Sequence, residues 1–189
     1  GITFDFAAIK DGFESEIFEA TKHLFSIDPD RERAATIWGI VLTRSGRLDE
    51  AERVFNAQLA EHGDSGVIYT NLAKVYFERR DITKVHELLL KGLTVDPNQE
   101  NGLSWFSSLH RELHGDSGYL KALFHVASLP GSWRASLWLG RDALQREHAA
   151  ALAFYSSGLE KAPRPAPADA LGQISADLGR VGRFADIFE

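Results

Sequence analysis

Few side chains in this chain could do chemistry, and their spacing fits no reaction centre. His110 and His114 are four residues apart, which on a helix puts both imidazoles on one face, as in a two-histidine metal site. No glutamate-histidine motif of the metalloprotease kind surrounds them. We therefore predict that both histidines are structural and that the chain holds no metal.

Phosphate-binding and nucleophilic motifs are also missing from the sequence. Residues 115–118 read Gly-Asp-Ser-Gly, but they have neither the lysine nor the preceding strand of a P-loop. We predict that this segment is a turn between helices. No Gly-x-Ser-x-Gly nucleophile elbow occurs anywhere. The sequence thus predicts no catalytic residue, no cofactor and no enzymatic activity.

A 34-residue period runs through the elements that would position any site. The hexapeptide that starts at Gly46 returns in related form at Gly182, four periods later. A large apolar residue followed by a small one occurs at 38–39, 72–73, 106–107, 139–140 (one residue early) and 174–175. Proline or glycine, which stop or redirect helices, occur at 29, 63, 97, 131 and 165. A fixed period of roughly 20 to 50 residues is typical of stacked repeat proteins.

Apolar residues spaced by three and four predict two amphipathic helices in each period. We expect helices over 32–44 and 48–61, a similar pair in the next period, a leading helix over 13–26 and a late helix over 169–180. No segment shows the sustained alternation of apolar and polar residues that predicts a strand.

The residues at equivalent positions of two successive periods carry a family resemblance. They are Trp38, Gly39, Leu42, Gly46, Ala51 and Phe55 in one, and Tyr69, Leu72, Ala73, Tyr76, Leu89 and Pro97 in the next. On these residues the chain resembles the tetratricopeptide repeat (TPR) family, whose unit is 34 residues of helix–turn–helix. The resemblance implies an all-α fold, a right-handed superhelical stack of antiparallel helix hairpins.

The repeat pattern predicts five segments. They are an N-terminal lead-in (1–12), an incomplete leading repeat (13–30), a TPR-like array (31–163), a Pro-rich connector (164–168) and a partial C-terminal repeat (169–189). We expect the semi-rigid connector to loosen the last repeat from the stack. The second helix of that repeat would have only seven residues, too few for a stable helix, so we expect a truncated segment of a longer protein.

Composition narrows the class of partner. The net charge is −6, which disfavours nucleic acid because nonspecific binding to phosphates needs a cationic field. The chain has no cysteine, which excludes disulfides and thiolate metal sites. It has no run of about 18 apolar residues, so we predict no membrane span. The compartment is left open, with the cytoplasm favoured.

The resemblance also implies a binding surface, because TPR partners commonly lie in a groove lined by the first helix of each repeat. Transferred to this sequence, that register predicts a partner-binding groove formed by Arg33, Ile40, Arg44, Lys74, Phe77, Arg111, Arg134, Arg141 and Leu144. Over all groove positions, six cations and two acids occur on an otherwise acidic chain. Two interpretations stay open: an acidic ligand, or the ordinary frequency of arginine and lysine on solvated helices. The chaperone-tail clamp of some TPR domains is broken here, with Thr36 and Ile40 at two of its positions.

Together these patterns predict a non-enzymatic scaffold for protein–protein interaction, which binds a protein or an extended peptide in its concave groove. An acidic peptide is one form of that ligand. Two alternatives stay open. The chain could be the substrate-recruiting domain of a larger multidomain enzyme, such as a transferase. It could also be a self-association module that pairs through the apolar C-terminal end around Phe184 and Phe188.

Overall fold

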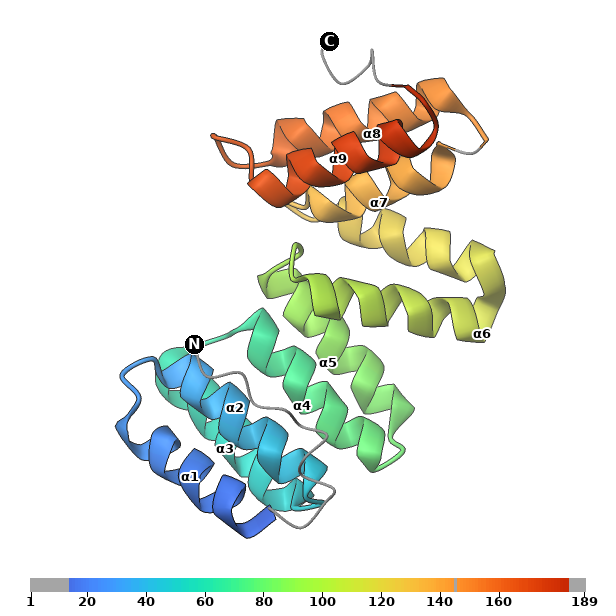
Figure 1. The fold of residues 1–189 in the computed structure, drawn as a ribbon. Helices are drawn as coiled ribbons and strands as arrows, with labels where there is room; N and C mark the ends of the chain where they lie inside the picture. Colours follow the sequence, from blue (N-terminus) through green and yellow to red (C-terminus); the bar gives the residue numbers. More distant parts are fainter. Residues whose placement is uncertain (1–13, 145, 184–189) are drawn as a thin grey trace. The chain divides into compact units, whose positions relative to one another are not determined.

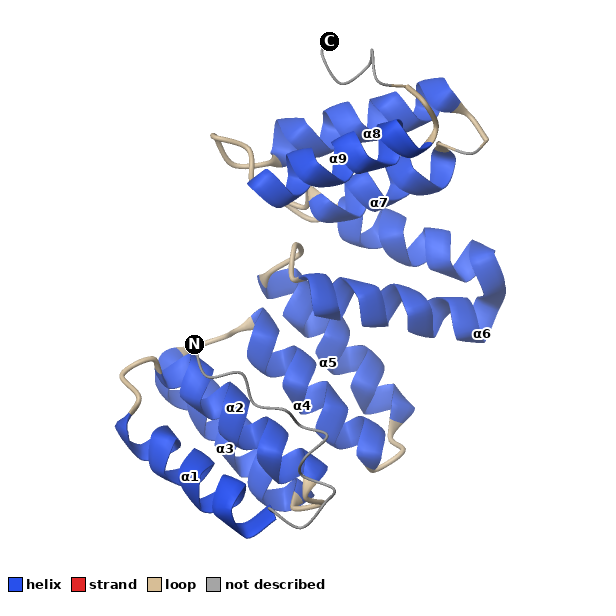
Figure 2. Cartoon of the chain, viewed as in Figure 1, coloured by secondary structure: helices blue, strands red, loops and turns tan. Residues whose placement is uncertain are grey.

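The computed structural model describes residues 14–144 and 146–183, and every regular element within these ranges is an α-helix (Figures 1 and 2). The expected helices over 13–26, 32–44, 48–61 and 169–180 are confirmed to within one residue at each end. In chain order the elements are α1 (Glu14–Ile27), α2 (Arg31–Arg44), α3 (Leu48–His62), α4 (Gly66–Glu78), α5 (Ile82–Val95), α6 (Glu100–Ala127), α7 (Arg134–Ala143), α8 (His148–Lys161) and α9 (Ala168–Arg180).

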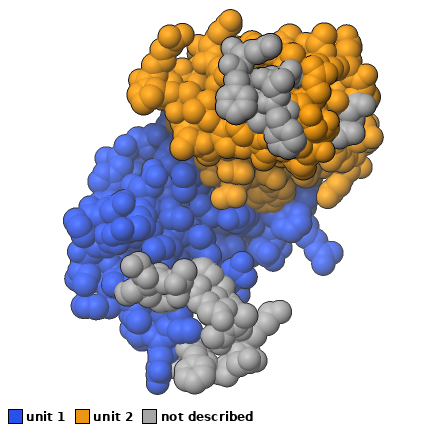
Figure 3. Space-filling model, turned by 45° about the horizontal axis from the view of Figure 1, so that its top comes forward, with its two compact units in different colours: residues 1–88 blue, residues 89–189 orange. Residues whose placement is uncertain are grey.

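The chain forms two compact units, residues 1–88 and 89–189, which Figure 3 shows in different colours. In the first unit, α2 packs against α1, α3 and α4. In the second, α7 packs against α6, α8 and α9. The first helix of a hairpin therefore touches both its own partner helix and the first helix of the next hairpin. This is how each repeat in a stack buries its apolar face.

The turn predicted at residues 115–118 is confirmed within α6. Gly115 has φ 66° and ψ −162°, so the element consists of two helices joined at this residue. That backbone conformation is available mainly to glycine. A side chain at Gly118 would in turn collide with the backbone oxygen of His110. Two glycines thus allow the chain to reverse at this point.

Three helices, α2, α4 and α9, end in the same turn, at positions that keep the 34-residue period. The amide N–H of Arg47 donates to the oxygen of Leu42 at 2.9 Å, and the bonds from Asp81 to Tyr76 and from Arg183 to Leu178 are 3.0 Å long. The residue just before each donor has positive φ: 74° at Gly46, 61° at Arg80 and 74° at Gly182. This six-to-one bond closes the helix in a Schellman-type cap. The recurrent hexapeptide is therefore a helix stop.

A small residue on the first helix of a hairpin faces a large residue on the second. A Cβ added to Gly39 in α2 would overlap the ring of Phe55 in α3. A Cβ added to Gly140 in α7 would lie 2.7 Å from the ring of Tyr155 in α8. The small residues therefore set how closely two helices approach, and the rings fill the space beside them.

The prediction that the Pro-rich connector loosens the last repeat is wrong. Ala170 and Leu178 of α9 are buried at 0% and 1% exposure, in the core cluster of the second unit. The other members of that cluster are Trp133, Leu137, Ala151, Tyr155 and Ala162. Apolar burial on this scale holds α9 against α7 whatever the stiffness of the connector.

The non-glycine residue in the recurrent turn gives a test of this account. Arg80→Gly should raise the free energy of unfolding by about 0.5 kcal/mol, because relief of the left-handed strain outweighs the added chain entropy. Gly46→Ala should lower it by about 1 kcal/mol through backbone strain alone, since nothing lies within 4 Å of a Cβ added there. Urea unfolding of both variants measures the two effects. If both substitutions changed the free energy of unfolding in the same direction, the assignment of the turn would be contradicted.

Candidate functional site

The predicted groove residues of the first unit lie on one continuous face. Ile40 and Arg44 are one turn apart on α2, and Lys74 and Phe77 are one turn apart on α4. The two helices pack against each other. We call these four residues the α2–α4 face. Phe77 is 50% exposed, which is unusual for a ring of its size, and Ile40 is half-buried.

Lys74, a cation of the α2–α4 face, is held by a buried side chain below it. Its Nζ donates to Oδ1 of Asn71 at 3.0 Å, and Asn71 is buried and donates through Nδ2 to the oxygen of Val67 at 2.9 Å. Partial burial lowers the pKa of Lys74, and the positive charge of Arg44 lowers it further. Two cations therefore stand close enough to repel each other on a face that also carries an exposed ring.

The other groove cation of the first unit has a partner within the chain. Both Nη2 and Nε of Arg33 donate to the carboxylate of Asp28, at 2.8 and 3.1 Å. This bidentate pair lowers the pKa of Asp28 through the hydrogen bonds from Arg33. Arg33 thus braces the segment that leads into α2, and its side chain remains 60% exposed.

Two groove cations of the second unit are likewise used inside the fold. Arg134 is only 12% exposed; its Nε donates to the backbone oxygen of Asn98 at 2.8 Å, and its Nη2 reaches Asp169 at 2.5 Å. Arg111 lies at the kink in α6, where it pairs with Asp116 at 3.1 Å and stacks on the ring of Tyr119. Both arginines therefore link one segment of the fold to another.

Arg141 and Leu144, two of the predicted groove residues, both line a small pocket of the second unit. Its volume is about 170 Å³, and Asp177, Arg180 and Val181 complete its lining. The Nε of Arg141 donates to both oxygens of Asp177, at 3.0 and 3.1 Å. The sequence did not single out Asp177, although a charged residue in the apolar register of the late helix was a visible signal.

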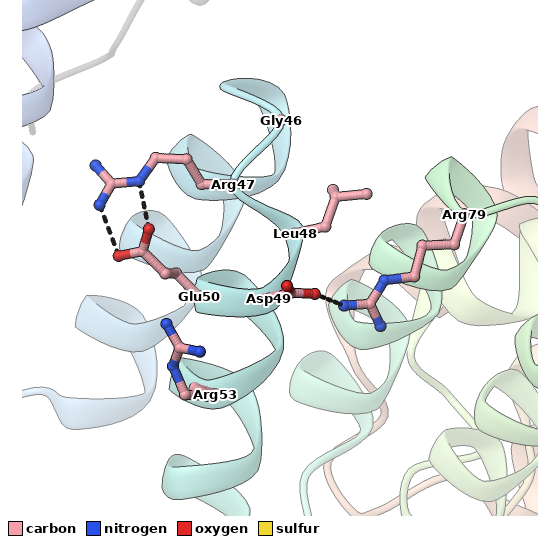
Figure 4. A pocket seen from close by; sticks show the side chains of 7 residues that line it. All are labelled: Gly46, Arg47, Leu48, Asp49, Glu50, Arg53 and Arg79. Carbon is pink, nitrogen blue, oxygen red and sulfur yellow. Dashed lines mark hydrogen bonds and ion pairs between the residues drawn. The ribbon is translucent and has the colours of Figure 1, made fainter.

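A second pocket, of about 450 Å³, lies at the turn between α2 and α3 and was not expected (Figure 4). Arg47 holds Glu50 through two bonds of 2.6 Å, and Arg79 reaches Asp49 at 2.6 Å. Hydrogen bonds from Arg47 lower the pKa of Glu50. Arg53 makes no ion pair with any described residue, yet its charge also acts on Glu50. Arg47 and Arg79 are paired with the two acids of the lining, so the net positive charge of this open pocket is that of Arg53.

The two histidines singled out in the sequence lie on one helix of the second unit. His110 and His114 share a face of α6 with ring centroids 6.1 Å apart, and His110 packs on Phe106. No group of three or more potential ligand side chains gathers among the described residues. None of the helices described there is long and apolar enough to cross a membrane. Phe184 and Phe188, the centre of the predicted self-association surface, lie outside the described residues.

Comparison with known proteins gives structural likenesses only. No protein-family model matches the sequence, and no curated protein matches it. The crystal structure of MamA is 16% identical over 85% of this chain and 96% of its own, with a TM-score of 0.47. A tetratricopeptide repeat protein from Parabacteroides merdae is 16% identical over 97% of this chain and 73% of its own, with a TM-score of 0.48. The TPR protein TTC0263 from Thermus thermophilus is 15% identical over 88% of this chain and 91% of its own, with a TM-score of 0.48.

The class of the fold follows from the chain's own features. Helix hairpins, a recurrent helix stop that keeps the 34-residue period and a small-on-large contact inside two of the hairpins define a TPR-like helical-repeat protein. The resemblance seen in the sequence is thus confirmed at the level of the fold.

The like-charge pair of the α2–α4 face can be measured directly. Arg44→Gln should raise the pKa of Lys74, because it removes a positive charge that disfavours the protonated amine. NMR titration of the Lys74 side chain in the alkaline range measures the shift. Arg33→Gln is the control, since Arg33 is engaged with Asp28. A Lys74 pKa that is unchanged in Arg44→Gln, or that moves equally in both variants, would contradict the pairing.

Proposed function

We propose that the chain is a non-enzymatic scaffold that binds a protein or an extended peptide on the first helices of its hairpins, and that an acidic segment occupies the α2–α4 face. The observation that carries this proposal is the juxtaposition of Arg44 and Lys74 beside the exposed ring of Phe77. Two like charges that repel each other are stabilised by a bound anion, because the anion attracts both of them.

The apolar residues of the face support a peptide rather than a small ion as the ligand. Phe77 and Ile40 offer contact area next to the two cations, and an exposed aromatic ring is a common anchor of protein interfaces. The cations would orient the ligand and speed its association, while burial of the ring would supply affinity. Asn71, buried below Lys74, holds the amine at the surface.

We do not give equal weight to all the residues that the sequence assigned to binding. Arg33, Arg111 and Arg134 each hold an acid of their own chain, so a ligand would have to displace an existing ion pair to reach them. We propose Ile40, Arg44, Lys74 and Phe77 as the primary contacts in the first unit, because the two cations lie close together on packed helices that also carry the two apolar side chains. Arg141, which holds Asp177 through Nε, and Leu144 are the proposed contacts in the second unit. The whole chain has a formal charge of −6, which repels acidic partners in general. A local cationic face would therefore direct such partners to one place on the surface.

A defined peptide pair tests the proposal. The probes are labelled peptides of about ten residues that alternate glutamate with leucine, or glutamine with leucine, long enough to span two neighbouring helices. Fluorescence anisotropy should show tighter binding of the glutamate peptide to the full chain. The double charge reversal Arg44→Glu with Lys74→Glu should weaken that binding at least about tenfold, a loss of 1.4 kcal/mol.

A matched control carries the same change in charge at another place. Arg53→Glu with Lys121→Glu also reverses two exposed cations, on second helices of their hairpins. This control should change the affinity by less than about twofold if the face, and not net charge, governs binding. Equal losses in the two double variants, or equal binding of the two peptides, would refute the acidic-ligand proposal.

A further inference from the structure

Asp177 buries a charged side chain at a position that is apolar in the first three repeats. Val41, Val75 and Leu109 follow one another at 34-residue intervals and are 4%, 0% and 7% exposed. Asp177 lies two periods after Leu109, and its side chain is 0% exposed. Burial of a carboxylate costs several kcal/mol unless donors compensate it. A repeat that needed only packing at this position would be served by another valine.

Three donors from two hairpins satisfy the buried carboxylate. Nε of Arg141 contacts both oxygens, at 3.0 and 3.1 Å, and the hydroxyl of Tyr155 donates to Oδ2 at 3.2 Å. Nη2 of Arg180 donates to Oδ1. Burial raises the pKa of Tyr155, and the negative charge of Asp177 raises it further, which keeps the phenol protonated as a donor. Asp177 therefore has a complete set of internal partners.

The arginines, in contrast, keep donor groups that face the pocket. Arg141 binds Asp177 through Nε alone, and its Nη1 and Nη2 make no hydrogen bond with any described residue. The side chains of Arg141 and Arg180 are 47% and 65% exposed. Both line the pocket of about 170 Å³, with Leu144 and Val181 on its wall. Two guanidinium groups and one carboxylate leave this cluster with one net positive charge.

We propose that this pocket binds one anionic group, a carboxylate or a phosphate, presented by a bound peptide, and that Asp177 is the positioning residue that holds the guanidinium groups for it. A guanidinium anchored through Nε presents its remaining N–H donors in a fixed plane, which suits the oxygens of such an anion. Fixing the donors in advance removes much of the entropy cost of binding. The apolar wall would accept the methylene groups of the ligand side chain.

Only one part of this proposal rests on the proposed function, namely that a bound peptide presents the anion. The pocket itself is tested with free anions. The probes are sodium acetate and sodium phosphate, added to the full chain at constant ionic strength with sodium chloride as the reference. NMR signals of the Arg141 and Arg180 guanidinium groups should shift saturably with acetate or phosphate. Shifts that do not saturate, or that chloride reproduces, would overturn the proposal.

Asp177→Asn separates positioning from simple charge attraction. This substitution adds one positive charge to the cluster, so charge alone predicts tighter anion binding. Loss of the anchored guanidinium geometry predicts the opposite, at least about fivefold weaker binding. Unchanged or tighter binding would overturn the role of Asp177. Arg141→Lys applies the same test if Asp177→Asn fails to fold: it keeps the charge but loses the Nε contact, and it should also weaken binding about fivefold.

Tyr155→Phe is the matched control, because it removes one donor to Asp177 and leaves both arginine contacts in place. Anion affinity should stay within about twofold of the original in this variant. A fivefold loss here would assign the effect to general disruption of the core and contradict the proposal. The peptide assay then distinguishes the two proposals. Saturable acetate binding without peptide binding would sustain the pocket and refute the scaffold, whereas peptide binding without an anion response would do the reverse.

Discussion

The contact between a small residue on the first helix of a hairpin and a large residue on the second is the constraint on which the rest depends. Gly39 against Phe55 and Gly140 against Tyr155 are its tightest instances. Ala73 and Ser107 continue the small series, and Leu89 and Leu123 continue the large one, all nearly fully buried. Close approach of its two helices gives each hairpin a compact shape with one apolar side. The apolar sides of successive hairpins bury one another only when the hairpins stack in register.

That packing also determines which side chains of packed helices come together. In the first unit α2 packs on α4, which brings Arg44 close to Lys74, one turn from Phe77. In the second unit the same logic brings Arg141 of α7 to Asp177 of α9, because α7 and α9 pack as first helices of neighbouring hairpins.

The sequence predicted the helices well because their signals are local. Apolar spacing and the Pro and Gly positions placed four helix ranges to within a residue. The sequence also predicted the chain reversal near Gly115, because this turn depends on the conformational freedom of the glycine itself. The prediction that α9 is loosely attached was wrong. The stiffness of a connector can be judged from the local sequence, whereas the burial of Ala170 and Leu178 depends on contacts with distant segments.

The candidate site was predicted only in part, for a related reason. Register alone selected Arg134 and Arg141 as free groove cations, but acids 35 and 36 residues further along pair with them. Such partners can be found in a sequence only once the repeat period is used to align neighbouring first helices. The repulsion between Arg44 and Lys74 depends on the same alignment and on burial, which no local pattern reports.

A double-mutant cycle on the central contact tests the account most directly. Gly39→Ala forces a methyl group into the ring of Phe55, and Phe55→Leu makes room for it at the expense of packing. The account predicts that the double variant is more stable than the sum of the single losses allows, with a coupling of at least about 1 kcal/mol in urea unfolding. Additive losses would show that residues 39 and 55 do not share a contact, and the hairpin packing described above would be contradicted.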